Sequence, residues 1–143
     1  MKQEQAEIQE QISIIVEWYK ELPKDYSNIE DLMYARKQLS THQFLMAVML
    51  SDLRQKWKES EVGTEIVRRT KAVELIIEGS PMTKVVEISK AESLGMLELE
   101  KMADVEYHNM RFIIEATQEV NNTIMQHISQ LKIEQRNISH SQT

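Results

Sequence analysis

The chain has no cysteine and few of the residues that interrupt helices. Among its 143 residues there are three Gly and two Pro, and aromatic residues make up only 6%. Without Cys there is no disulfide and no thiolate metal site, which makes an intracellular protein the simpler interpretation. Three glycines are too few for the phosphate-binding loops, dinucleotide-binding fingerprints and nucleophile elbows of many enzymes. We therefore expect no catalytic residues and no enzyme activity.

Signals for membranes and metals are also missing from the sequence. The first residues, MKQEQAEIQEQ, do not resemble a signal peptide, and no apolar run reaches membrane-spanning length. None of the four histidines follows a Glu by three residues, as a di-iron bundle would require, and no zinc-protease motif occurs. We expect a cytoplasmic protein without a metal, without a cofactor and without membrane contact.

Residues typical of long helices are abundant, since Glu, Gln, Lys, Ile, Leu and Met dominate the composition. This composition predicts an all-α fold. Residues 1–23 are expected to form an amphipathic helix, because Ile8, Ile12 and Ile15 recur at separations of three and four. Pro23 ends this helix.

A long antiparallel helical hairpin is expected over residues 28–136. Its first helix starts at about Asn28, where Ser27 and Glu30 match a capping box. Every seventh position is then apolar, which predicts coiled-coil-like packing. The residues of this heptad are Leu32, Leu39, Met46 and Leu53.

The hairpin turns at residues 79–81, where Gly79-Ser80-Pro81 combines a left-handed cap with a residue that cannot continue a helix. A third helix should run from about Thr83 to about Arg136, and the tail 137–143 should fray. The density of Val and Ile leaves another interpretation of residues 72–90 open, namely two short β-strands around the turn.

Self-association is expected, because a two-helix hairpin is too thin to bury the apolar faces of both helices. The predicted oligomer interface consists of Leu32, Leu39, Met46, Met49, Leu53, Phe112, Val120 and Ile124.

Positive charge is concentrated in the middle of an acidic chain. The net charge is -6, distributed as -5 over residues 1–31, +3 over 32–90 and -4 over 91–143. Several copies side by side would bring these basic segments together into a basic rim that follows a phosphate backbone. Trp57 lies between two lysines and is able to stack on a base, although packing within the hairpin is the stronger alternative. The predicted nucleic-acid-binding residues are Lys56, Trp57, Lys58, Arg68, Arg69, Lys71, Lys84 and Lys90.

Three features together resemble a family of small helical phage proteins. They are the helix YARKQLSTHQFLMAVMLSDL, the basic stretch that leads to a Gly-containing turn, and a return helix that ends in NNTIMQHISQLK. In layout they resemble the UvsY-type recombination mediators, over roughly residues 30–133. The resemblance implies a homo-oligomer in the host cytoplasm that binds single-stranded DNA, contacts a recombinase and a single-strand-binding protein, and helps the recombinase to load.

The sequence leaves a second function open. An oligomeric coiled-coil interaction factor of a phage, with a structural, chaperone-like or host-defence-blocking role, would bind protein only. Its basic segment would then meet an acidic surface on a partner protein.

Overall fold

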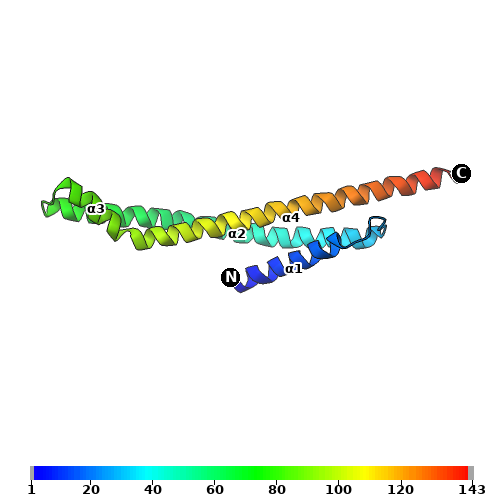
Figure 1. Ribbon diagram of the computed structural model, residues 1–143, viewed down its shortest axis with the longest axis horizontal. Coiled ribbons are helices and arrows are strands. Elements are labelled where there is room, and N and C mark those ends of the chain that lie inside the picture. Colours follow the sequence, from blue (N-terminus) through cyan, green and yellow to red (C-terminus); the bar gives the residue numbers. More distant parts are fainter. Residues whose placement is uncertain (1, 142–143) are drawn as a thin grey trace. The chain divides into compact units, whose positions relative to one another are not determined.

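A computed structural model describes residues 2–141 of the chain. All regular secondary structure in this part is helical, and Figure 1 shows the helices in chain order. The all-α prediction is therefore confirmed, and the two β-strands considered for residues 72–90 are wrong. The helices are α1 (Lys2–Lys20), α2 (Ile29–Ile77), α3 (Met82–Glu92) and α4 (Leu94–Ser141).

The chain divides into two compact units, each described by itself. The terminal unit comprises α1, the first part of α2 and the last part of α4, within residues 2–49 and 112–141. The turn unit is Leu50–Arg111 and contains the rest of α2, all of α3 and the start of α4. Helix α4 continues beyond the expected end at Arg136 to Ser141, and the last two residues of the tail expected to fray lie outside the described residues.

In the terminal unit the heptad residues of α2 form the core. Leu32, Leu39 and Met46 have no exposed surface, as the seven-residue spacing predicts. Each of the other two helices contributes a buried apolar face, whose residues are three or four positions apart in the sequence. Those faces are Ile8, Ile12 and Ile15 of α1 and Ile124 and Ile128 of α4.

Two hydrogen bonds fix the direction of α2 and α4 within the terminal unit. Asn121 Nδ2 donates to Ser40 Oγ over 2.9 Å, and Gln43 Nε2 donates to Gln118 Oε1 over 2.7 Å. As the residue number rises along α2 it falls along α4, so the two helices run antiparallel here. A long helix therefore packs against another, as the hairpin prediction requires.

The N-terminal cap of α2 differs from the prediction by one residue. Asn28, and not Ser27, accepts a hydrogen bond from a helix amide, over 3.2 Å from the Asp31 nitrogen to Asn28 Oδ1. Both residue types are good caps, and Asp31 adds a negative charge in the first turn. The sequence signal was correct in kind but placed one position too early.

His127 of α4 holds the corner between α1 and α2. Its Nε2 lies 3.1 Å from the carbonyl oxygen of Tyr26, which can only accept, so this nitrogen carries the proton. Nδ1 is then the acceptor for the Tyr19 hydroxyl at 3.3 Å. Burial raises the pKa of Tyr19, which keeps this hydroxyl a donor. The histidine thus bonds to two segments that are distant from it in sequence.

The turn unit takes its name from the chain reversal at Gly79, shown in Figure 1. The Ser80 amide donates a hydrogen bond to the Leu75 carbonyl oxygen over 3.1 Å. The Gly79 amide donates one to the Ile76 carbonyl oxygen over 3.0 Å. This pair of bonds is a Schellman motif, which requires a left-handed residue, and Gly79 supplies it with a φ of 81°. Pro81 follows and precedes the first residue of α3. The predicted turn is confirmed.

Two glycine substitutions should have opposite effects on stability. Gly79→Ala should lower the free energy of unfolding by about 1–2 kcal/mol, because Ala is strained at positive φ. Gly95→Ala should raise it by about 0.5–1 kcal/mol, because Gly95 is inside α4 and an added Cβ meets nothing within 4 Å. Urea unfolding at one protein concentration measures both. If both substitutions changed the free energy of unfolding by the same amount and in the same direction, the turn would not depend on the positive φ of Gly79.

The predicted third helix is interrupted at Ser93, so the chain has α3 and α4 in place of one helix. The Ser93 amide shares its hydrogen bond between the carbonyl oxygens of Ser89 and Lys90, at 3.3 and 3.2 Å. The Ser93 hydroxyl also donates to the Lys90 oxygen over 2.9 Å. Side-chain bonds of this kind compete with the regular helical pattern and tighten the turn locally. A serine gives too weak a sequence signal for this break to be predicted.

Candidate nucleic-acid interface

All eight residues predicted to contact nucleic acid belong to the turn unit. Six of them are exposed, whereas Trp57 and Lys71 are half-buried. The exposed residues come from two helices. Lys56, Lys58, Arg68 and Arg69 extend from α2, and Lys84 and Lys90 extend from α3.

The chain reversal brings the cations of α3 back along α2. Gly63 of α2 approaches α4 so closely that an added Cβ would be 2.7 Å from the Met96 methyl carbon. This contact places the start of α4 beside α2 within the turn unit. Lys84 and Lys90 belong to α3, which lies in sequence between this contact and the Gly79 turn.

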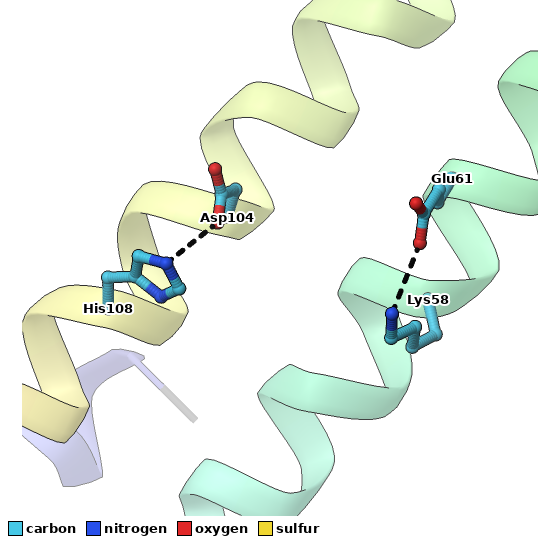
Figure 2. Close-up of polar contacts among 4 residues, drawn as sticks. All are labelled: Lys58, Glu61, Asp104 and His108. Carbon is cyan, nitrogen blue, oxygen red and sulfur yellow. Dashed lines mark hydrogen bonds and ion pairs between the residues drawn. The ribbon is translucent and has the colours of Figure 1, made fainter.

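Three of the predicted cations form ion pairs with carboxylates of their own helix. The Nζ–Oε2 distance is 3.4 Å for Lys58 and Glu61, shown in Figure 2, and 3.6 Å for Lys71 and Glu74. Arg69 Nη2 lies 3.0 Å from an oxygen of Glu65. Such pairs on a helix surface contribute about 0.3–0.5 kcal/mol, which is small enough for a phosphate to replace the carboxylate.

Four predicted cations have no acidic partner among the described residues. They are Lys56, Arg68, Lys84 and Lys90, and all four are exposed. No carboxylate of the described residues forms an ion pair with them, so each is able to contact an anion without first breaking an ion pair. These four form the strongest part of the candidate interface, and we call them the unpaired cations.

Trp57 packs within the turn unit. Its ring stacks on that of Tyr107 from α4, with centroids 5.4 Å apart and an interplanar angle of 29°. The His108 ring meets Trp57 edge-on at 5.7 Å, and Lys58 Nζ lies 4.9 Å from the indole centroid. Because these contacts occupy the ring, the packing alternative describes Trp57 better than stacking on a base.

His108 belongs to a polar pair on α4, next to this aromatic cluster. Figure 2 shows its ring directed at Asp104, one turn earlier, with Nε2 3.4 Å from Oδ1. That oxygen is buried and has no hydrogen-bond partner among the described residues. Neither residue was singled out from the sequence, because an isolated His and Asp at helical spacing are common on solvated faces.

The turn unit as a whole is not basic. It contains ten Lys and Arg residues and twelve Asp and Glu residues. A positive potential in this unit would therefore require a local grouping of its cations. The basic interface stays a prediction.

Most residues of the predicted oligomer interface are used inside a single chain. Phe112 is 70% exposed and Val120 is half-buried, but the other six are at most 7% exposed. Heptads indicate that a helix packs against another helix without saying whether the partner is in the same chain. The residues buried within the chain are Leu32, Leu39, Met46, Met49, Leu53 and Ile124.

Other apolar side chains are left open instead. In the apolar stretch FLMAVML (residues 44–50), Phe44 is 68% and Val48 51% exposed. On α4 the buried positions are Ala103 and Met110, while Val105 is 57% exposed. The large apolar residues of these helices therefore do not all lie on the packing face.

Metal-binding clusters and membrane-spanning helices are absent from the described residues. No group of three or more His, Asp or Glu side chains within residues 2–141 is arranged to hold a metal ion. No helix in that range is long and apolar enough to cross a membrane. No family model, curated protein or solved structure matches the chain.

Proposed function

We propose that this protein binds single-stranded DNA without catalysing a reaction, and that it helps to load a recombinase as the recombination mediators it resembles do. The observation that supports the proposal best is the set of unpaired cations, which extend from two helices on either side of the Gly79 turn. The protein partners, a recombinase and a single-strand-binding protein, are proposed from the resemblance.

The proposed mechanism is electrostatic. Lys and Arg side chains of the turn unit bind backbone phosphates, and counterions leave the DNA. Phosphate contacts hold a strand in place but carry no sequence information. With Trp57 packed against Tyr107, stacking adds little. The bound strand is held extended and presented to the recombinase, with no preference for sequence.

Self-association would make a weak site strong. Four unpaired cations on one copy predict a slope of log affinity against log salt of only about -3. A ring or bundle that places the turn units side by side multiplies the contacts along one strand. The basic rim thus depends on assembly.

A surplus of exposed apolar side chains supports such an assembly. Phe44, Phe112 and Ile77 are 68%, 70% and 80% exposed. An interface between copies would cover side chains of this kind.

The same surplus favours a second candidate function, an oligomeric interaction factor that binds only protein. Under that alternative the exposed apolar residues would bind the partner, and the cations would keep the surface soluble or meet acidic groups. Salt-dependent DNA binding separates the two candidates.

Fluorescence anisotropy with a labelled oligonucleotide tests the proposal. At about 50 mM salt we expect binding at low micromolar protein, with similar affinity for mixed and homopolymeric sequences. Light scattering of the same sample gives the mass of the assembly. A protein that forms an oligomer but binds no oligonucleotide under these conditions would support the second candidate instead.

A further inference from the structure

A groove runs along the outer side of α2 in the terminal unit. Its volume is about 550 Å³. The residues that line it are three or four positions apart in the sequence, so they lie on one face of the helix. Met33 and Phe44 lie at its two ends and are 51% and 68% exposed. The lining residues are Met33, Arg36, Lys37, Ser40, Thr41 and Phe44.

The groove is basic in an otherwise acidic unit. Arg36 and Lys37 are the only cations of α2 within the terminal unit, and no carboxylate of the described residues forms an ion pair with either. The unit as a whole has seven Lys and Arg residues against eleven Asp and Glu residues. An occupant should therefore be negatively charged, with an apolar residue in its centre.

Helix α1 of the same unit carries a face of this description. Its buried side is the Ile8, Ile12 and Ile15 stripe. On the solvent side four glutamates surround Ile14, which is 55% exposed. These residues recur at separations of three and four, so they form one stripe, the acidic stripe: Glu7, Glu10, Ile14, Glu17 and Glu21.

The acidic stripe and the groove cannot pair within one chain. A separate hollow lies between α1 and α2. It is lined by Ile14 and Trp18 of α1 and by Tyr34 and Gln38 of α2, among others, so these α2 residues mark the side that faces α1. None of these residues lines the basic groove. The groove therefore lies on a different side of α2 from α1, and only a second copy can bring its acidic stripe there.

We propose that the acidic stripe of α1 in one copy docks into the basic groove of α2 in the next. The charges are opposite, and Ile14 would cover apolar surface between Met33 and Phe44. Because the two surfaces differ, the contact is head-to-tail, and such contacts close into rings or continue as filaments. This inference rests on the proposed self-association and identifies the surfaces that make it.

Charge reversal tests the docking. We expect Arg36→Glu with Lys37→Glu to lower the mass of the assembly at about 50 mM salt to that of a smaller species, because groove and stripe then repel. Glu10→Lys with Glu17→Lys leaves two positive and two negative charges on the stripe, so it should also lower the mass by removing the attraction. Light scattering gives the masses, and circular dichroism checks that each variant is folded.

Mixing the two variants is the decisive step. In the mixture the unchanged stripe of one variant meets the unchanged groove of the other, and the lysines introduced at positions 10 and 17 meet the glutamates introduced at positions 36 and 37. The large assembly should therefore form again. A chain with all four substitutions should also assemble. A merely structural effect of the substitutions would not be rescued by mixing. As a matched control, Lys24→Glu with Lys132→Glu changes the charge by the same amount on exposed residues outside the groove and should leave the mass unchanged.

Three outcomes would overturn the inference. If both variants keep the wild-type mass, other surfaces make the assembly. If only the groove variant dissociates, a different acidic segment occupies the groove. If the mixture of folded variants stays small, the two surfaces do not meet. A wild-type protein that is monomeric at about 100 µM would instead refute the proposed self-association itself, while loss of DNA binding alone would leave the docking intact.

Discussion

Replacing Arg68, Lys84 and Lys90 together by Gln should lower the affinity for single-stranded DNA by at least about 30-fold at about 50 mM salt. The three side chains are exposed and have no acidic partner among the described residues. Each phosphate contact with a single strand adds about 0.7 to the salt slope. The slope should therefore become shallower by about 2. Anisotropy titrations at several salt concentrations measure both changes.

A control with the same change in net charge separates this site from general attraction. Lys20, Lys24 and Lys132 are exposed lysines of the terminal unit, and their replacement by Gln should alter affinity and slope little. Equal losses in the two triple variants would show that overall charge, and not the turn unit, governs binding. Gln has a helix propensity close to that of Lys and Arg, and the replaced side chains are exposed, so the fold should not change.

Leu39→Ala should lower the free energy of unfolding by about 2–5 kcal/mol. Leu39 has no exposed surface, and its heptad neighbours Leu32 and Met46 have none either. The truncation leaves a cavity that close-packed neighbours fill only in part. Urea unfolding, followed by circular dichroism at one fixed protein concentration, measures the loss.

Leu45→Ala is the matched control in the same helix. Leu45 is 39% exposed, so its truncation should cost about 1 kcal/mol or less. If the two leucines contributed equally, the heptad face that includes Leu39 would not be the core of the terminal unit.

Those parts of the fold with a strong local signal were predicted correctly from the sequence. The seven-residue spacing of Leu32, Leu39 and Met46 identified the buried face of α2. Gly79 followed by Pro81 located the chain reversal, because few residues adopt a positive φ without strain. In both cases one physical requirement dictates the residue type.

Other parts depend on tertiary context. The break at Ser93 rests on a side-chain hydrogen bond that a serine inside a helix does not always make. On α4 Ala103 and Met110 are buried, while Val105 and Phe112 are exposed. Residue type alone therefore does not identify the packing face of this helix.

The sequence predicted which Lys and Arg residues belong to the candidate site, but not which of them form ion pairs. The sequence showed that Lys and Arg gather around the turn, but not which of them pair with carboxylates. Arg69 has Glu65 as its partner, whereas Arg68 has no ion-pair partner among the described residues. A heptad likewise cannot distinguish an intramolecular from an intermolecular partner, which is why Leu39 was expected at an oligomer interface.

The central claim is that cations of the turn unit, repeated by self-association, hold a single strand by its phosphates. The most direct test is the slope of log affinity against log salt for an oligonucleotide on the assembled wild-type protein. We predict a slope of about -3 or steeper, since each copy contributes about four unpaired cations. A slope near zero, or no binding at about 50 mM salt, would contradict the account.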